Sequence, residues 1–408
     1  MTAPDTNFLP YGRQNIDDDD IAAVVDVLRS DFLTSGPIVE AFEAKLCQIT
    51  GASETVSCSS ATAALHIAAL ALGLGPGDWA VVPAITFLAT ANAIRYTGAD
   101  VIFADVNPDS GLMTAATFQA AIDINSDKNI RAVLPVHLAG QPADPVGIAA
   151  IARGKGIKVI EDASHALGTS YMVEKGKEPH KVGSCTHADM TVFSFHAVKV
   201  IACGEGGAVT TRDPSLAKRL RLFRNHGMTR ASEDFTNSEL SSDDTGVINP
   251  WYYEMAEPGY NYRLTDIHAA LGLSQLGKLD QFTDRRRQIV ARYDERLAGL
   301  GACLHLIAHI PACQIGWHLY PVLIDFDTLG LSRAVVMSRL RRLGIGTQVH
   351  YIPVSDQPYY TQLYGKHDLS GAQAYYARVL SLPLFPAMKD SDVDRVIEAL
   401  ERVLGSAI

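Results

Sequence analysis

Two hydrophobic patterns alternate along residues 55–215 of the chain. Some stretches have the apolar content and length of helices, and between them lie short apolar runs typical of buried strands. The helical stretches are Ala61–Leu72, Ala89–Tyr96, Thr114–Ile124 and Pro145–Gly154. The short runs are Trp79–Val82, Val101–Asp105, Ala132–His137, Lys158–Glu161 and Met190–Phe195. Because strands that alternate with helices are joined by crossovers, this region predicts an α/β fold with a mostly parallel sheet covered on both faces.

The rest of the chain predicts further parts around this sheet. A helix is expected to begin near Asp17–Asp20, where acidic side chains suit the helix dipole. Residues 228–258 are polar and then aromatic, and predict a long excursion from the sheet. Beyond residue 270, helical stretches again alternate with apolar runs such as His318–Ile324. We therefore expect an N-terminal arm and helix at 1–40, a large domain at 41–270 and a smaller C-terminal α/β domain at 271–408.

Composition narrows the class of protein. The chain has 408 residues, of which 47% are hydrophobic, and its net charge is −10 without a basic cluster dense enough to follow a nucleic-acid backbone. Its six cysteines are scattered, with neither C-x-x-C nor zinc-finger spacing, so reduced thiols and no metal site are expected. The N-terminus lacks an apolar signal core, and the most apolar stretch, Ala63–Leu74, is too short to cross a bilayer. These features predict a cytoplasmic protein without nucleic-acid or membrane partners.

Lys199 is the first candidate for chemistry. It stands between a strand-like run, Thr191–His196, and a glycine cluster, Gly204–Gly207. In one interpretation its stem packs on apolar surface while the amine reaches water, as for most lysines. In the other, the amine lies beside a cofactor and forms a Schiff base with an aldehyde or ketone. Gly204–Gly207 lacks the G-x-G-x-x-G pattern, which makes a Rossmann dehydrogenase a poor alternative.

Other candidate residues follow the predicted strands. Asp162, His165, Ser194 and Lys199 stand at or just after strand ends, where ligands bind in parallel sheets. A cofactor that forms a Schiff base with lysine is pyridoxal phosphate, whose pyridinium nitrogen needs a carboxylate partner to stay protonated. Asp162 would supply that carboxylate, although a strand-end carboxylate also caps the next helix. Glu161 points to the opposite side of a strand and is the weaker candidate.

Two further features would complete a pyridoxal phosphate site. The hydroxyl residues of Cys58–Ala63 open a helix, whose free N–H groups suit a phosphate, although Ser and Thr cap many helices. The aromatic face of Phe87 would cover the cofactor ring, although an isolated Phe is more often part of the core.

The whole set of motifs resembles the DegT/DnrJ/EryC1/StrS family of sugar-nucleotide aminotransferases, which have the aspartate aminotransferase (PLP-dependent transferase type I) fold. The motifs that carry the resemblance are Pro10-Tyr11-Gly12-Arg13-Gln14, Leu33-Thr34-Ser35-Gly36-Pro37, Ser60-Ala61-Thr62-Ala63-Ala64-Leu65, Glu161-Asp162-Ala163-Ser164-His165-Ala166, Ser194-Phe195-His196-Ala197-Val198-Lys199, Gly204-Glu205-Gly206-Gly207 and Gly259-Tyr260-Asn261-Tyr262-Arg263-Leu264-Thr265-Asp266. Family dehydratases have histidine where this chain has Lys199. Cys203 and Val200 depart from the Thr and Asn that the family pattern favours.

The resemblance implies roles for these residues. Lys199 would form the Schiff base with pyridoxal 5′-phosphate, Asp162 would pair with the pyridine nitrogen, and His165 and Phe87 would lie against the ring. The implied phosphate contacts are Ser60, Ala61, Thr62 and Ser194, with Asn261 reaching the site of the neighbouring subunit in a homodimer. The implied contacts to the sugar nucleotide are Tyr11, Arg13, Thr34, Arg263, His350 and Tyr351.

Two motifs, Glu161–His165 and Pro250–Met255, most resemble one subgroup of the family. Its members transfer an amino group from glutamate, which leaves 2-oxoglutarate, to C4 of UDP-4-keto-6-deoxy-L-AltNAc in pseudaminic acid biosynthesis. The alternatives are another 3- or 4-aminotransferase of the same family, acting on a different nucleotide sugar, and a non-catalytic protein that retains the cofactor-binding fold.

Overall fold

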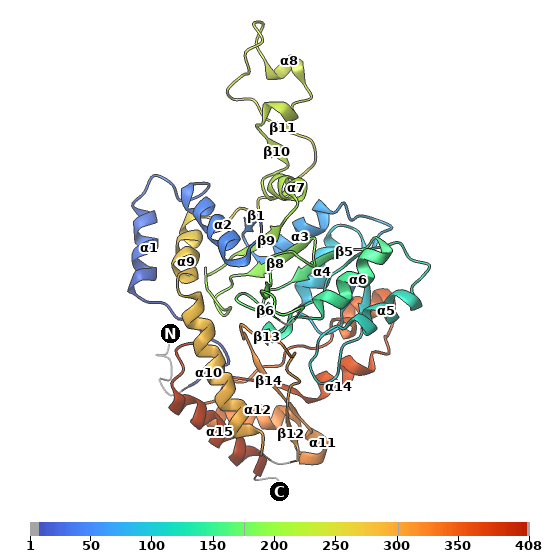
Figure 1. The fold of residues 1–408 in the computed structure, drawn as a ribbon, viewed down its shortest axis with the longest axis vertical. Coiled ribbons are helices and arrows are strands. Elements are labelled where there is room, and N and C mark those ends of the chain that lie inside the picture. The colour runs from blue at the N-terminus through green and yellow to red at the C-terminus, as the bar shows by residue number, and fades with distance from the viewer. Residues whose placement is uncertain (1–7, 175, 301, 406–408) are drawn as a thin grey trace.

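The computed structural model describes residues 8–174, 176–300 and 302–405, so the first seven residues of the predicted arm lie outside it. A seven-stranded sheet occupies the middle of the molecule, in the order β1-β9-β8-β5-β4-β2-β3 (Figure 1). Its strands are β1 (Glu54–Cys58), β2 (Trp79–Pro83), β3 (Asp100–Ala104), β4 (Ile130–Val133), β5 (Lys158–Asp162), β8 (Met190–Ser194) and β9 (Gly207–Thr211). The predicted α/β fold with a mostly parallel sheet is therefore confirmed.

Strand β9 is the antiparallel member of this sheet. It pairs antiparallel with both β1 and β8, whereas β8, β5, β4, β2 and β3 pair parallel to one another. No helix separates β8 from β9, and antiparallel neighbours need no helical crossover. The connection between them carries Lys199, which places the lysine at the carboxyl end of β8.

Helices cover both faces of the sheet, as the alternation of side chains along each strand requires. Val82 and Val192 pack on the face covered by α3, α4 and α7, whereas Val81 packs on the opposite face with α5 and α6. Phe193 also points away from Val192 and packs with α2 and α9. These helices are α2 (Pro37–Thr50), α3 (Ala61–Ala71), α4 (Leu88–Tyr96), α5 (Ala115–Ile124), α6 (Pro145–Lys155), α7 (Pro214–Arg224) and α9 (Asp266–Leu276).

The C-terminal part forms a second layered unit below the main sheet in Figure 1. A three-stranded antiparallel sheet, β12-β14-β15, packs with helices around one hydrophobic core. Its elements are β12 (Leu304–Leu306), β14 (Tyr320–Ile324), β15 (Val379–Leu382), α10 (Leu279–Leu297), α12 (Arg333–Arg342), α14 (Ser370–Arg378) and α15 (Asp390–Gly405). The same core includes Ala84, Ile85 and Leu138 of the N-terminal half, so the two parts pack against each other. The domain limits at 40/41 and 270/271 stay a prediction.

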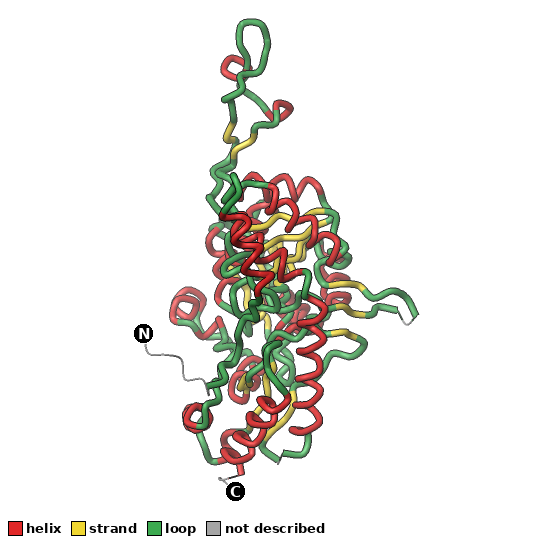
Figure 2. Tube along the Cα trace, turned by 90° about the vertical axis from the view of Figure 1, so that its left-hand side faces the viewer, coloured by secondary structure: helices red, strands yellow, loops and turns green. Residues whose placement is uncertain are grey.

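The excursion at residues 228–258 is an arm that extends away from the rest of the chain in both Figure 1 and Figure 2. At its base, β10 (Met228–Thr229) pairs antiparallel with β11 (Glu254–Met255), and α8 (Ser238–Ser241) lies farther out. At the left of Figure 1, α1 (Asp18–Leu28) packs beside α9. The remaining short elements are β6 (Ser170–Tyr171), β7 (His180–Lys181), β13 (Cys313–Gln314), α11 (Phe326–Leu329) and α13 (Pro358–Tyr364). Within the described ranges no helix has the length and apolar character to cross a bilayer.

Candidate functional site

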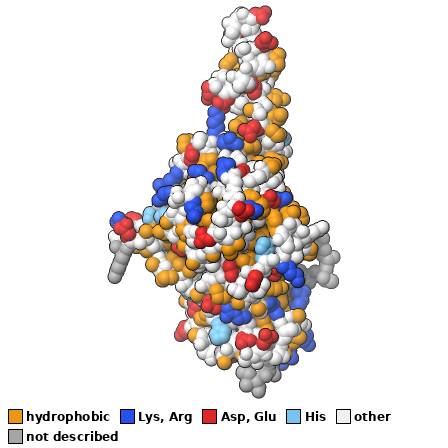
Figure 3. All heavy atoms as spheres, turned by 90° about the vertical axis from the view of Figure 1, so that its right-hand side faces the viewer, with side chains coloured by type: hydrophobic (Ala, Val, Ile, Leu, Met, Phe, Trp, Pro, Cys, Tyr) orange, Lys and Arg blue, Asp and Glu red, His pale blue; other side chains and the backbone are white. Residues whose placement is uncertain are grey.

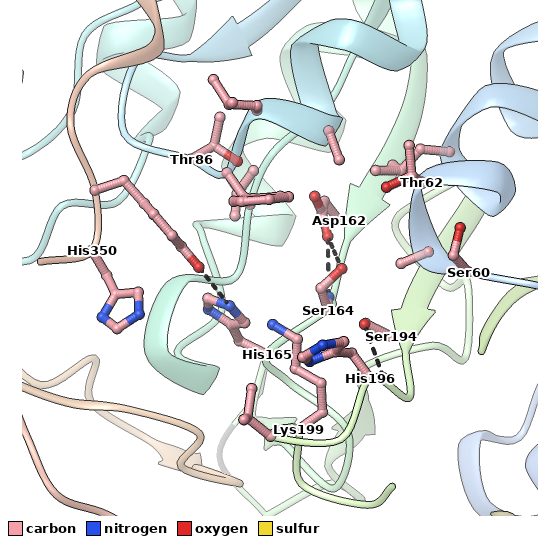
Figure 4. A pocket seen from close by; sticks show the side chains of 18 of the residues that line it. Ser60, Thr62, Thr86, Asp162, Ser164, His165, Ser194, His196, Lys199 and His350 are labelled. Atoms are coloured by element: carbon pink, nitrogen blue, oxygen red, sulfur yellow. Dashed lines mark hydrogen bonds between the residues drawn. The ribbon is translucent and has the colours of Figure 1, made fainter. Parts of the chain in front are cut away.

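A cavity of about 580 Å³ opens at the carboxyl ends of β5 and β8 (Figure 4). Its walls come from both halves of the chain, since the first turn of α3 and the start of α4 face the segment Gln348–Ile352. The residues predicted from the sequence that line it are Tyr11, Ser60, Ala61, Thr62, Phe87, Asp162, His165, Ser194, Lys199, His350 and Tyr351. Most of the predicted site therefore converges in one cavity.

Lys199 is held by the tight connection between β8 and β9. Its N–H donates to the His196 carbonyl at 2.8 Å, and Phe195 is tied to Gly206 and Cys203 by backbone hydrogen bonds. The side chain extends into the cavity, with its amine toward Ser164 and His165 in Figure 4. Burial lowers the pKa of Lys199 to about 8, and the nearby Asp162 carboxylate partly opposes this shift. An amine whose pKa lies close to physiological pH is suited to nucleophilic and proton-transfer chemistry.

Asp162 is buried at the end of β5, where its carboxylate accepts bonds from two hydroxyl groups. Thr90 Oγ1 donates to Oδ2 at 2.7 Å, and Ser164 Oγ donates to Oδ1 at 2.6 Å. Thr86 Oγ1 lies 2.7 Å from Thr90 Oγ1 and extends this chain of hydroxyls. These neutral partners hold the carboxylate in place without neutralising its charge, so Asp162 is able to receive a cationic N–H from a ligand ring.

The first turn of α3 forms the anion-binding end of the cavity. Ser60 Oγ caps the helix by accepting from the Ala63 N–H at 3.1 Å, and the N–H groups of the preceding positions have no acceptor within the helix. β9 approaches α3 closely at this point. A Cβ on Gly207 would lie only 2.4 Å from Ser60 C and 2.5 Å from Ala61 N. Ser194 lines the same part of the cavity. This arrangement suits a phosphate group.

Aromatic side chains form the opposite wall. His165 and Tyr351 are linked through Nε2 and Oη at 3.2 Å, and Tyr11 packs on His350 with ring centroids 5.4 Å apart. His350 Nδ1 lies 2.8 Å from Ser381 Oγ, and burial lowers the pKa of His350 to about 3. Histidines in this wall are thus neutral near physiological pH.

Phe87 stands at the edge of the cavity. It precedes α4, has 57% of its surface exposed, and lies 6.0 Å from Tyr351 between ring centroids. The alternative that Phe87 is a core residue is therefore wrong, and its ring is available to cover a bound group.

Four predicted residues do not line this cavity. Thr34 and Asn261 are exposed and bridge to Thr265 and Asn225, while Arg263 Nη1 donates to Asn225 Oδ1 at 2.6 Å. These three residues lie on the side of the chain that carries the base of the arm. Arg13 is exposed on the N-terminal segment.

Several residues of the site were not assigned a role from the sequence. His196 and Glu205 line the cavity mouth, with Nε2 and Oε1 4.0 Å apart, and Gln348 belongs to the opposite wall. Ser164 had a usable signal, since a hydroxyl residue two positions after an aspartate often bonds back to its carboxylate. Thr90 had none, because its contact with Asp162 depends on how α4 packs on β5.

Comparisons with known proteins agree with this geometry. Residues 14–401 match the model of the DegT/DnrJ/EryC1/StrS aminotransferase family. The chain is 38% identical to the spore coat polysaccharide biosynthesis protein SpsC of Bacillus subtilis, over 100% of both chains. Among solved structures, PseC of Helicobacter pylori, an aminotransferase involved in the biosynthesis of pseudoaminic acid, has 27% identity and a TM-score of 0.85, covering 98% of this chain and 100% of PseC. The PLP form of the putative sugar aminotransferase Spr1654 of Streptococcus pneumoniae has 30% identity and a TM-score of 0.83, covering 98% of this chain and 100% of Spr1654.

Proposed function

Because the chain belongs to the DegT/DnrJ/EryC1/StrS aminotransferase family, we propose that it moves the amino group of L-glutamate to C4 of UDP-4-keto-6-deoxy-L-AltNAc, a step of pseudaminic acid biosynthesis. The cofactor of this sugar aminotransferase is pyridoxal 5′-phosphate.

One observation carries the residue assignment. Lys199, Asp162 and the first turn of α3 meet in a single cavity of about 580 Å³. An amine, a carboxylate and an anion-binding helix end match the three polar parts of pyridoxal phosphate, which are its aldehyde, its ring nitrogen and its phosphate. The close approach of Gly207 to Ser60 leaves the α3 end without a side chain in front of it. The donor set thus fits the cofactor.

The bound cofactor would supply an electron sink for the charge that develops at the amino-acid α-carbon. Asp162 would accept the ring N–H and keep the ring cationic, with Thr90 and Ser164 fixing the carboxylate. Lys199, with a pKa near 8, would take the proton from the α-carbon and return it one position away as general base and acid. Glutamate and the keto sugar would use the same groups in turn, which predicts ping-pong kinetics.

The separation of Thr34, Asn261 and Arg263 from the cavity supports a homodimer with shared sites. A UDP sugar carries two phosphates, yet the described residues that line the cavity include no arginine. Arg263 and Asn261 would supply the missing donors to the cavity of a second copy. The exposed apolar residues of the arm, including Trp251 at 71% and Met255 at 62%, offer surface for such contact (Figure 3).

Product assignment by NMR, after incubation with L-glutamate and a panel of nucleotide keto sugars, tests this function. We expect a new C4 amine on UDP-4-keto-6-deoxy-L-AltNAc, and no turnover by the Lys199→Ala variant. Borohydride reduction of the holoenzyme followed by peptide mapping should label Lys199. Label on another lysine, or near-normal turnover by Lys199→Ala, would contradict the assigned mechanism. A non-catalytic binding protein would keep its yellow absorbance when glutamate is added, whereas the proposed enzyme should bleach.

One comparison favours a different nucleotide sugar as the substrate. Identity to SpsC, a polysaccharide biosynthesis protein, is 38%, whereas identity to PseC is 27%. The second candidate is therefore amination of another nucleotide keto sugar for a surface polysaccharide. Turnover of a different sugar in the same panel, with the pseudaminic intermediate untouched, would favour it.

A further inference from the structure

We propose that His318 is a positioning residue that holds His165 as its Nε2–H tautomer, so that the Tyr351 hydroxyl donates a hydrogen bond into the cavity to an oxygen atom of the substrate. This inference deepens the proposed function and rests on it. The substrate oxygen belongs either to a carboxylate of the amino donor or to the keto sugar.

The tautomer of His165 follows from a backbone donor. The Ala139 N–H points at His165 Nδ1, 3.3 Å away, and an N–H group is a donor only. Nδ1 must therefore be unprotonated, so the neutral ring carries its proton on Nε2. Burial, reinforced by the nearby charge of Lys199 and by His350, lowers the pKa of His165 and keeps this ring neutral.

The direction of the Tyr351 hydroxyl follows from the tautomer. His165 Nε2 lies 3.2 Å from Tyr351 Oη and donates to it. Burial raises the pKa of Tyr351, so the hydroxyl keeps its own proton. In the described part of the chain, His165 is the hydrogen-bond partner recorded for this oxygen, and Tyr351 lines the cavity. The remaining hydroxyl proton is thus available to a ligand oxygen.

His318 holds this arrangement from behind, outside the cavity lining. Its ring packs on His165 with centroids 4.5 Å apart, and its main-chain N–H donates to the Ala139 carbonyl at 2.9 Å. Ala139 adopts a left-handed conformation, with φ 59°, that costs energy for a residue with a Cβ. This main-chain bond holds the turn that aims the Ala139 N–H at His165, and the His318 ring holds the His165 ring against that N–H.

Arg286 anchors His318 in turn. This side chain is 1% exposed, and it donates through Nη1 to the carbonyls of His318 at 3.2 Å and Leu384 at 3.0 Å. No ion pair with an acidic side chain is recorded for Arg286 among the described residues, and burial lowers its pKa to about 9. A buried cation bonded to main-chain carbonyls fixes the path of the segment that carries His318.

Paired variants of two part-buried tyrosine–histidine contacts test the donor role of Tyr351. Tyr351→Phe removes the donor from the cavity, while Tyr171→Phe removes an equivalent hydroxyl, 2.8 Å from His187 Nδ1, outside it. We expect Tyr351→Phe to raise KM by roughly fivefold to tenfold, the equivalent of one lost hydrogen bond, with Tyr171→Phe unchanged. The two half-reactions are followed separately through the absorbance of bound cofactor, with L-glutamate or UDP-4-keto-6-deoxy-L-AltNAc as substrate. A raised KM for L-glutamate assigns the oxygen to the amino donor, and a raised KM for the nucleotide sugar assigns it to the keto sugar. An unchanged KM in both would overturn the inference.

A double-mutant cycle tests whether His318 acts through this hydroxyl. His318→Ala keeps the main-chain bond to Ala139 but removes the ring that packs on His165. It should raise KM in the half-reaction that Tyr351→Phe affects, and should add nothing in the Tyr351→Phe background. A full additional effect there would mean that His318 acts by another route, against the inference. If His318→Ala does not fold, His165→Gln and His165→Leu replace it. Gln retains an acceptor for Ala139 and a donor for Tyr351, so it should preserve KM better than Leu, and equal losses would contradict the relay.

The tautomer of His165 can be measured directly. Nitrogen-15 NMR of histidine-labelled holoenzyme should show His165 protonated on Nε2 and not on Nδ1. A proton on Nδ1 would overturn the inference whatever the activity. Failure of the wild-type enzyme to accept an amino group from glutamate would instead contradict the proposed function, so the two failures are distinguishable.

Discussion

At the scale of single residues, the cavity favours the uncharged form of the Lys199 amine. Burial is the main cause, and the buried rings of His165 and His350 remain neutral beside it. Asp162 is the group that opposes this shift. The amine is therefore more reactive toward a carbonyl than an exposed lysine at the same pH.

The reactivity of Lys199 should follow its lowered pKa. In the apoenzyme, brief labelling with an acylating reagent should increase as the pH rises and level off above about pH 8, because the neutral amine is the nucleophile. The ordinary value of 10.5 would instead make the increase continue well beyond that pH. Peptide mapping with mass spectrometry measures each lysine separately, and the exposed lysines of the same sample serve as internal controls. If the labelling of Lys199 kept rising with pH as the labelling of the exposed lysines does, the lowered pKa of Lys199 would be contradicted.

Thr90 should contribute to cofactor retention through Asp162. Thr90→Val keeps the shape of the side chain but removes the 2.7 Å bond to Oδ2. We expect the Kd for pyridoxal phosphate to rise roughly fivefold, the equivalent of about 1 kcal/mol for one buried hydrogen bond. Thr283→Val is the matched control, since its hydroxyl is also buried but donates to the Leu279 carbonyl away from the cavity. Fluorescence titration of the apoenzymes compares the two, and equal Kd values would exclude this role.

At the scale of elements, the junction of α3 and β9 is the tightest part of the site. Gly207→Ala would place a Cβ within 2.5 Å of the α3 backbone, so the helix end must move. We expect a loss of about 1–3 kcal/mol in the free energy of unfolding, together with a weaker hold on the cofactor phosphate. Gly154→Ala in α6, where a Cβ meets nothing within 4 Å, should leave both unchanged or slightly improved. Urea unfolding and cofactor titration of the two variants measure the contrast.

The hydrophobic pattern predicted most elements of the main sheet, but not all of its topology. Ala61–Leu72 and Pro145–Gly154 differ from α3 and α6 by one residue at the C-terminal end, because apolar periodicity is a local property. β1 and β9 were not predicted, and β9 is an antiparallel strand between β1 and β8. Its place depends on pairing with Glu54–Cys58, a segment far away in the sequence. The positions of the strand ends predicted that Asp162 and Lys199 lie together. The contacts of Thr90 with Asp162 and of His318 with His165 depend on how distant parts of the chain pack, which no local pattern encodes.

At the scale of the whole molecule, the predicted site residues form two groups. One group lines the cavity, the other lies near the base of the arm with Asn261 and Arg263, and Arg13 on the N-terminal segment belongs to neither. If both groups serve one substrate, each chain must supply its second group to another chain. Resemblance to a family assigned both groups to one site, whereas in a single chain the second group lies outside the cavity.

Complementation between two inactive variants should reveal such shared sites. Lys199→Ala lacks the amine in its own cavity, and the double variant Asn261→Ala/Arg263→Ala lacks the groups offered to its partner. After mixing and subunit exchange, half of the dimers would be mixed, and each of these would have one intact site. About a quarter of wild-type activity should therefore return from two nearly inactive proteins. Each variant subjected to the same exchange alone is the control. Sites built from one chain would give no recovery, because neither chain alone would then carry a complete set of residues.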